Sequence, residues 1–231
     1  MSDLDLTKIV RFDFPENQYI NESTAKKQVY LHHTVSPNNA QSVANYWEST
    51  QERVAVSILV AQDGTICQLY SSDKWAYHLG LSTDIFKQYN IPYQSLDRIS
   101  IGIEILSWGA LAMAANGKWY PAIWDSVNKK VAPNTKCGVV QNVQQYEDGF
   151  RGYFGFERYT DEQIESVRQL LCYWNKTHNI PLDYNADMWD ISPRALSGTA
   201  GIFTHVSVRK DKSDCHPQPE LIEMLQNLKN S

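Results

Sequence analysis

The sequence lacks any long apolar run and any apolar segment behind a basic N-terminus. Nowhere in its 231 residues do about 18 consecutive apolar positions occur, which is the length that a membrane-spanning helix needs. The first residues, MSDLDLTKIVRFDFPEN, lack the apolar core that follows a positive segment in a Sec signal peptide. We therefore expect no membrane insertion, no signal peptide and synthesis in a cytoplasm.

A basic surface field and a disulfide framework are also missing. The formal net charge is -5, and no cluster of basic residues stands out that could attract a phosphate backbone. The spacing of the four cysteines fits no disulfide scaffold, and a chain of this length does not need one. These absences argue against a nucleic-acid-binding protein and leave the cysteines as free thiols or as a single metal ligand.

Strand and helix patterns alternate along the chain. Runs rich in β-branched residues predict strands at 28–35, 98–106 and 201–208, and a hairpin over 53–70 that turns at Asp63-Gly64. Helical periodicity or helix-start signals predict helices over 38–51, 160–178 and from Pro219 onward. This order predicts an α/β fold in which helices flank a central mixed β-sheet.

Residues 108–158 break the pattern. They have no clean period, carry turn signals such as Asn116-Gly117 and are rich in Trp, Tyr and Phe. We predict a single domain, 1–231, with a core at about 28–107 and 160–227. The segment 108–158 is predicted to be an aromatic-rich insertion, partly hairpin-like and folded over that core.

Two adjacent histidines in the first predicted strand must point in opposite directions, because side chains alternate across a strand. His33 shares a face with Val29, Leu31 and Val35, so a packing role is expected for it. His32 lies on the polar face. In the strand 98–106, isoleucines fill one face, whereas Glu104 lies on the other beside the side-chain-free Gly102.

Polar groups at strand faces and adjacent loops suggest a metal site. They are His32, Glu104, His205 and the cluster Lys212–His216. A catalytic zinc site takes three protein ligands from imidazole, carboxylate or thiolate groups, with water in the fourth position. Each residue alone is more often structural, but together they supply two histidines, a carboxylate or thiolate, a second carboxylate as general base and a lysine for an oxyanion.

Five segments resemble, in order, the motifs of one enzyme family. They are VYLHHTVS, VAVSILVAQDGTICQLY, KWAYHLG, ISIGIEI and THVSVRKDKSDCHP. Together they resemble the zinc-dependent N-acetylmuramoyl-L-alanine amidases of the amidase-2 type. That group includes phage amidase-type lysozymes, bacterial cell-wall amidases and peptidoglycan recognition proteins. The resemblance covers roughly 28–107 and 160–227.

The resemblance implies a role for individual residues. His32 and His205 match the family's histidine ligands for Zn2+, and Glu104 matches the acidic residue that activates water. His78, in the loop AYHLG, matches a histidine at the cleft edge that would contact substrate. The phage branch uses a tyrosine where this chain has Val56, followed by Ser57, and this departure shifts the catalytic load to Glu104.

The third ligand is ambiguous between two neighbours. If Lys212-Ser213-Asp214 is the family's lysine-x-ligand pattern, Lys212 stabilises the oxyanion and Asp214 binds the metal. Cys215 offers a thiolate, a good zinc donor, but then Ser213 stands where the lysine belongs. We expect Asp214 and keep Cys215 as the alternative.

The function implied is a zinc hydrolase that cleaves the amide bond between N-acetylmuramic acid and L-alanine of peptidoglycan. We expect a monomeric phage-type endolysin that reaches the cell wall after release from the host cytoplasm, with the aromatic insertion shaping the glycopeptide cleft. The alternatives are a cytoplasmic muropeptide-recycling amidase and an inactive peptidoglycan-binding module. An inactive module typically loses a ligand, whereas this chain has candidates for all three.

Overall fold

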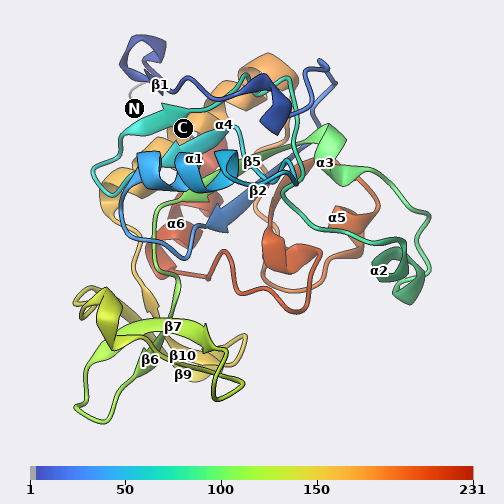
Figure 1. Cartoon of the computed structure of the whole chain (residues 1–231). Coiled ribbons are helices and arrows are strands. Elements are labelled where there is room, and N and C mark those ends of the chain that lie inside the picture. Colours follow the sequence, from blue (N-terminus) through green and yellow to red (C-terminus); the bar gives the residue numbers. More distant parts are fainter. Residues whose placement is uncertain (1–3, 231) are drawn as a thin grey trace.

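A computed structural model describes residues 4–230, and its centre is a six-stranded sheet (Figure 1). The strand order is β1-β4-β3-β5-β2-β11. The pairs β11·β2, β2·β5, β3·β5 and β1·β4 are parallel, whereas β3·β4 is antiparallel, so the predicted mixed sheet is confirmed. The strand bounds are β1 Val10–Arg11, β2 Gln28–His33, β3 Ile58–Val60, β4 Ile66–Gln68, β5 Ser100–Ile105 and β11 Gly201–Thr204.

Helices cover both faces of this sheet. In Figure 1, α1 (Ala40–Glu48) lies in front of the sheet and α4 (Asp161–His178) behind it. The terminal helix α6 (Pro219–Asn227) contributes Leu221 and Leu225 to the same buried cluster as α4. Three shorter helices complete the set: α2 Thr83–Gln88, α3 Leu96–Ile99 and α5 Pro193–Leu196. Among residues 4–230, the structure has no helix that is long and apolar enough to cross a membrane.

The predicted helix over 160–178 is confirmed with its cap. Thr160 and Gln163 form a capping box, in which each side chain bonds the other residue's backbone N–H. The apolar stripe of α4 packs on the isoleucines of β5. The predicted hairpin is also confirmed, since β3 and β4 pair across the turn at Gly64.

The predicted strand over 201–208 is too long. It ends at Thr204, and His205–Ser207 form a 3-10 turn. The cause is a set of hydrogen bonds: the backbone N–H of Thr204 donates to the Ser207 hydroxyl, and the hydroxyl groups of Thr204 and Ser207 both donate to the carbonyl of Met188. Similarly, the strand predicted from residue 98 begins only at Ser100, after the short helix α3.

The segment after β5 forms a second sheet of its own. Its strand order is β8-β7-β6-β10-β9, all antiparallel. The bounds are β6 Ala110–Met113, β7 Trp119–Asp125, β8 Lys130–Pro133, β9 Val143–Phe150 and β10 Tyr153–Glu157. Figure 1 shows this sheet projecting from one side of the main body. The expectation of a partly hairpin-like segment understated a continuous five-stranded sheet.

Candidate metal centre

The site lies at the carboxyl end of the central parallel strands. His32 and Glu104 are direct neighbours in the register of β2 and β5, so their side chains leave the same face of the sheet. His205 comes directly after β11, whose Phe203 is aligned with Tyr30 of β2. Carboxyl ends of parallel strands are the usual position of a site in an open α/β sheet.

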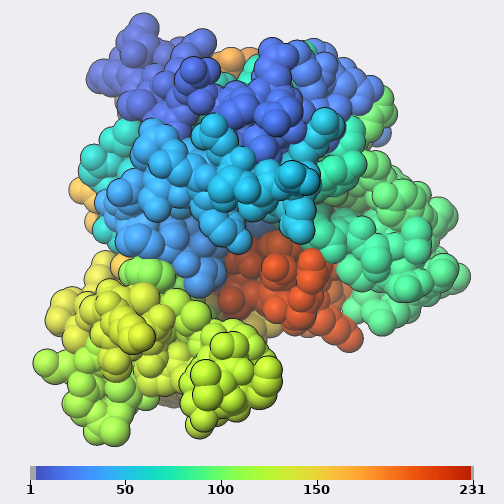
Figure 2. Space-filling view, viewed as in Figure 1, coloured from blue at the N-terminus to red at the C-terminus, as the bar shows by residue number. Residues whose placement is uncertain are grey.

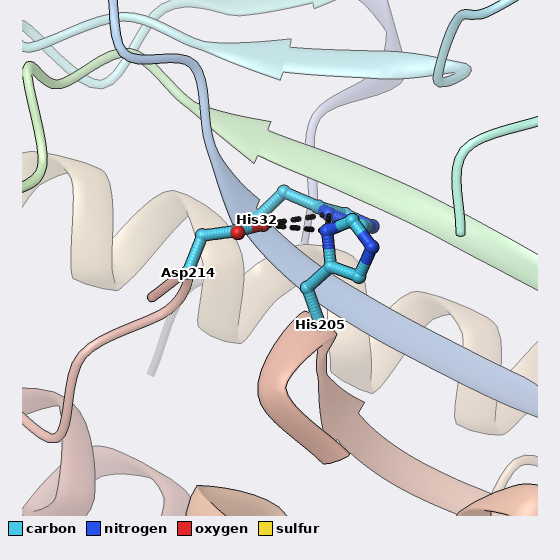
Figure 3. A group of neighbouring side chains, drawn as sticks. All are labelled: His32, His205 and Asp214. Carbon is cyan, nitrogen blue, oxygen red and sulfur yellow. Dashed lines mark hydrogen bonds and ion pairs between the residues drawn. The ribbon is translucent and has the colours of Figure 1, made fainter. Parts of the chain in front are cut away.

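Three side chains converge on one point there (Figure 3). His32 Nδ1 lies 3.1 Å from His205 Nδ1, and Asp214 Oδ2 lies 2.9 Å from His32 Nδ1 and 3.0 Å from His205 Nδ1. Their side chains are only 2%, 7% and 13% exposed, in the order His32, His205, Asp214. These three residues form a group with metal-binding geometry.

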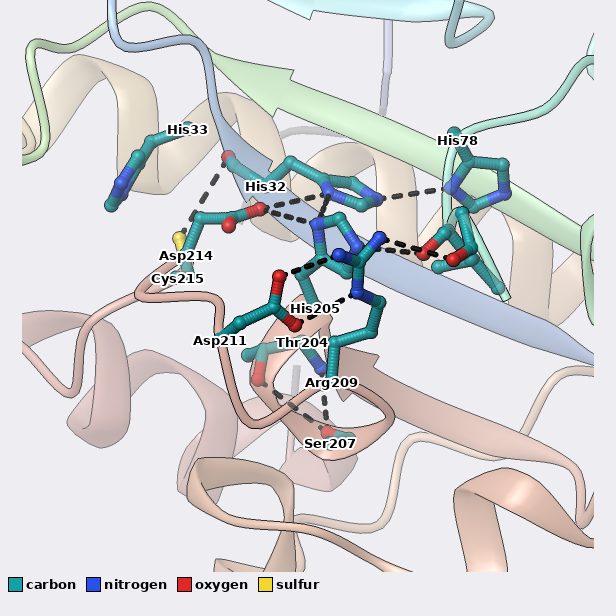
Figure 4. Close-up of polar contacts among 12 residues, drawn as sticks. His32, His33, His78, Thr204, His205, Ser207, Arg209, Asp211, Asp214 and Cys215 are labelled. Carbon is teal, nitrogen blue, oxygen red and sulfur yellow. Dashed lines mark hydrogen bonds and ion pairs between the residues drawn. The ribbon is translucent and has the colours of Figure 1, made fainter. Parts of the chain in front are cut away.

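The far nitrogens of both histidines are already hydrogen-bonded, as Figure 4 shows for His32 and His78. His205 Nε2 donates to the carbonyl oxygen of Leu79 at 3.0 Å. His32 Nε2 lies 3.0 Å from His78 Nδ1, and His78 Nε2 lies 2.9 Å from the Ser100 hydroxyl. Protons on the Nε2 atoms satisfy every one of these contacts and leave both Nδ1 lone pairs for a cation.

The pKa shifts in this group favour neutral histidine and ionised aspartate. Burial lowers the pKa of His32 to about 4. Burial alone would raise the pKa of Asp214, but the charges and hydrogen bonds of His205 and His32 outweigh it and hold that pKa well below its usual range. Neutral imidazole and carboxylate are the forms that bind zinc.

Glu104 lies beside the three donors without joining them. Burial, helped by the negative charge of Asp214, raises the pKa of Glu104 well above its usual value, and the positive charge of Lys212 opposes this shift. Its Oε2 atom is buried without a hydrogen-bond partner. A carboxylate with a free oxygen at this place can take a proton from a water molecule held by the donors.

Lys212 lies on the loop between His205 and Asp214. Its backbone N–H donates to the carbonyl of Arg209, which closes a turn within that loop. Its charge acts on both Glu104 and His32, so it belongs to the electrostatic environment of the site.

Cys215 faces away from the three donors. Its Sγ lies 2.8 Å from the Tyr159 hydroxyl, and the residue is fully buried. Burial is the main cause that raises the pKa of the Cys215 thiol well above its usual value, so the thiolate that a metal needs is disfavoured. The structure therefore groups Asp214, and not Cys215, with the two histidines.

Two supporting residues were not predicted from the sequence. Tyr159 accepts hydrogen bonds from the Cys215 thiol and from the backbone N–H of His216, and its hydroxyl lies 3.1 Å from His33 Nδ1. It thereby ties β2 to the loop that carries Asp214. Ser100 is the other residue, because it holds His78 from behind. Ser100 lies on the same strand face as Glu104, but nothing in the sequence pairs it with His78, and Tyr159 lies just before α4 outside any motif.

His78 lies behind His32 instead of projecting openly from a loop. Its side chain is 4% exposed, and both ring nitrogens have protein partners. The predicted contact between His78 and substrate stays a prediction, but the geometry gives this ring a second role as the hydrogen-bond acceptor of a donor histidine.

The donor set fits zinc. Two imidazole nitrogens and one carboxylate oxygen are the ligand types of catalytic zinc sites. Three ligand atoms at about 2.0–2.2 Å from a tetrahedral ion lie about 3.3–3.6 Å from one another, a few tenths of an ångström more than here. The three separations of 3.1, 2.9 and 3.0 Å therefore need only small side-chain rotations to accept the ion.

Comparisons with known proteins identify a family and a shared fold. A family model described as N-acetylmuramoyl-L-alanine amidase matches residues 22–219. The solved structure of PlyL is similar with a TM-score of 0.50 and 15% identity, covering 95% of this chain and 96% of that chain. The structure of a PlyL mutant has a TM-score of 0.50 and 14% identity, and the match covers 96% of this chain and 99% of that chain. The structure of the selenomethionine derivative of AmpD has a TM-score of 0.46 and 16% identity, and the match covers 95% of each chain. No curated protein matches the sequence. The likeness to PlyL shows a shared fold.

Proposed function

This chain belongs to the N-acetylmuramoyl-L-alanine amidase family, and from that premise we propose how its own residues divide the reaction. The bond hydrolysed is the amide between N-acetylmuramic acid and the L-alanine of peptidoglycan. His32, His205 and Asp214 hold Zn2+ in this proposal, through the three atoms that converge in the structure. The chemistry that zinc supplies when bound is polarisation of a carbonyl and a lowered pKa of bound water.

Glu104 is proposed as the general base. It stands next to His32 in the register of the sheet, and its buried Oε2 atom has no protein partner. That oxygen is available to accept the proton of the attacking water and to return it to the leaving amine of L-alanine. A carboxyl group with a raised pKa suits both steps, because it binds the proton firmly enough to carry it between them.

Lys212 is proposed to stabilise the oxyanion that forms when water adds to the amide carbonyl. An ammonium group in a partly dry site stabilises such charge more strongly than it does in water. Its electrostatic effects on Glu104 and His32 support a position near the reacting atoms.

His78 is proposed as a positioning residue. By accepting the Nε2 proton of His32, it keeps the lone pair on His32 Nδ1 and fixes the plane of that ring. Burial lowers the pKa of His78 well below its usual value, so the ring stays neutral and able to accept.

The convergence of the three donor atoms is the observation that carries this proposal. The same observation argues against an inactive peptidoglycan-binding module, because the complete donor set and Glu104 are present. For the biological setting we propose a phage-type endolysin in preference to a muropeptide-recycling enzyme, since the second sheet beside the metal-bearing loop suits an extended substrate (Figure 1). We also propose a monomer, because one chain supplies every residue of the site.

Product analysis tests the activity. Purified peptidoglycan is incubated with the zinc-loaded protein, and the released material is analysed by mass spectrometry. The proposal predicts intact stem peptides with a free L-alanine amino group and no new reducing sugar ends. Release of sugars, or release of peptides that start beyond L-alanine, would contradict it. Light scattering after size exclusion tests the monomer.

A further inference from the structure

The second sheet has one face that turns toward the main body, which we call the inner face. Paired residues of an antiparallel sheet share a face, so the register assigns its members. They are Gln144 and Tyr146 of β9, Phe156 of β10, Ala110 and Ala112 of β6, Tyr120, Ala122 and Trp124 of β7, and Val131 and Pro133 of β8.

One end of the inner face packs against the loop that carries Asp214. The ring of Phe156 stacks on His216 with centroids 4.7 Å apart, and the Tyr146 hydroxyl lies 2.8 Å from His216 Nδ1. Since His216 is two residues from Asp214, this end of the inner face contacts the loop that carries a proposed metal ligand.

The other end of the inner face is uncovered. Trp124 and Val131 are cross-strand neighbours, and they are 59% and 41% exposed. Val127, in the turn that joins β7 to β8, is 86% exposed. Between the two ends, Ala110 and Tyr120 are buried, whereas Ala112 and Ala122 are half-buried. The ring of Trp124 is therefore exposed to solvent at one end of the inner face, whose other end contacts the metal-bearing loop.

The exposed end lies near the body rather than far from it. β7 runs antiparallel to β6, so Trp124 lies toward the end where β6 leaves the main domain. β7 is two strands from β10, which corresponds to about 10 Å across the sheet. In Figure 2 the red surface of the C-terminal region is recessed between the yellow-green surface of the second sheet and the green surface of earlier residues.

Trp124, Val127 and Val131 form the exposed patch, and the turn that joins β7 to β8 beside it is held in shape by its own hydrogen bonds. The Asp125 carboxylate accepts hydrogen bonds from the backbone N–H groups of Val127 and Asn128 and from the Asn128 side chain. A braced turn loses little conformational entropy when a ligand binds beside it.

We propose that Trp124 is a glycan platform, on which a sugar ring of the peptidoglycan strand stacks while the scissile amide lies at the metal centre. This inference rests on the proposed function and names the part of the substrate that the second sheet holds. A pyranose ring has a face of C–H groups that matches the exposed face of an indole. Trp124 offers such a face at low entropic cost.

Geometry favours a sugar strand over a lipid surface. The exposed residues Lys129 and Lys130 flank the patch, so an anionic membrane is the competing partner. However, a bilayer is flat, whereas the inner face turns toward the metal-bearing loop of the same molecule. A glycan strand is narrow and continues on both sides of the residue whose amide is cleaved, so one substrate can extend from the metal centre toward Trp124.

Binding of a tetrasaccharide of N-acetylglucosamine tests the platform without any turnover. We predict that the wild-type protein binds it and that Trp124→Ala loses about tenfold in affinity, the loss expected for a removed aromatic contact. Tyr46→Ala, which removes a ring 68% exposed on α1, is the matched control and should bind like the wild type. Both variants should keep the wild-type zinc content and melting temperature.

A second readout compares substrates. Trp124→Ala should slow stem-peptide release from intact peptidoglycan and leave hydrolysis of a single-sugar muropeptide within twofold of the wild type. Equal saccharide binding by Trp124→Ala and Tyr46→Ala, no saccharide binding by the wild type, or binding to anionic phosphatidylglycerol vesicles in place of saccharide would each overturn the inference. Saccharide binding that persists in a protein without amidase activity would instead refute the proposed function and leave the platform standing.

Discussion

His32 Nε2 lies 3.0 Å from His78 Nδ1, on the opposite side of the His32 ring from the atom that faces His205 and Asp214. One imidazole thus decides which nitrogen of another is free to bind a metal. The Ser100 hydroxyl, 2.9 Å from His78 Nε2, completes the chain of hydrogen bonds. These hydrogen bonds are therefore as much a part of the metal centre as the donor residues themselves.

Replacing His78 should weaken zinc binding. His78→Phe removes the acceptor, so we expect a loss of zinc affinity of about 10–100-fold, measured by competition with a chelator. His78→Asn retains an oxygen acceptor near the position of Nδ1, so its loss of zinc affinity should be smaller. Tyr77→Phe, at the exposed neighbouring position, is the control. If His78→Phe bound zinc with unchanged affinity, the proposed positioning role of His78 would be wrong.

Replacing Glu104 should separate metal binding from catalysis. Glu104→Gln keeps the shape and loses the proton acceptor, so kcat should fall by about 10²–10⁴-fold while zinc content stays at the wild-type level. Glu162→Gln, on the exposed side of α4, serves as the control. A Glu104→Gln enzyme with more than a tenth of wild-type activity would show that another group is the base.

Asp214 and Cys215 should behave oppositely. Asp214→Ala removes a donor and should abolish tight zinc binding. Cys215→Ala should keep zinc and lower the free energy of unfolding by about 1 kcal/mol, because the buried thiol loses its hydrogen bond to Tyr159. Elemental analysis and thermal unfolding measure the two effects. If Cys215→Ala empties the site and Asp214→Ala does not, the assignments of Asp214 and Lys212 both fail.

Lys26 should make stability depend on alkaline pH. Burial lowers the pKa of Lys26 to about 8 in the folded chain, against a usual value of 10.5. Between these values the unfolded chain binds more protons, so the stability of the folded state rises with pH through the window from about 8 to 10.5.

The Lys26 effect can be isolated by one substitution. Below pH 8 the folded protein bears the cost of burying the charge, so Lys26→Met should stabilise it at pH 7 by an amount on the order of 1–3 kcal/mol. The advantage should shrink toward pH 10, as followed by urea unfolding. A difference that does not depend on pH would contradict the assignment. Lys27→Met is the exposed neighbouring control.

Much of the central fold and of the donor set could be predicted from the sequence, because strong local patterns coincide with the fold there. Alternation in β2 correctly separated His32 from His33, and the capping box at Thr160 correctly started α4. The order of motifs brought His205 and Asp214 to the same place as His32. Asp214 was preferred over Cys215 because the family resemblance places a lysine two positions before the ligand, and the structure groups Asp214 with the histidines.

The rest depends on long-range contacts that leave no local pattern. Met188 accepts the hydrogen bonds that end β11 early, although it lies 16 residues before Thr204. Tyr159 meets Cys215 across 56 residues of sequence. The second sheet was not predicted in full because its strands bury few side chains, so the alternation of apolar and polar residues along them is weak. His78 was recognisable as a site residue, but only the packing of its ring against His32 shows which way it points.

The most direct test of the metal centre is X-ray absorption at the zinc edge of the loaded wild-type protein. We predict a first shell of nitrogen and oxygen only, at about 2.0–2.2 Å, with the multiple scattering of two imidazole rings. A sulfur neighbour at about 2.3 Å would place Cys215 in the shell in place of Asp214 and contradict the account at its centre.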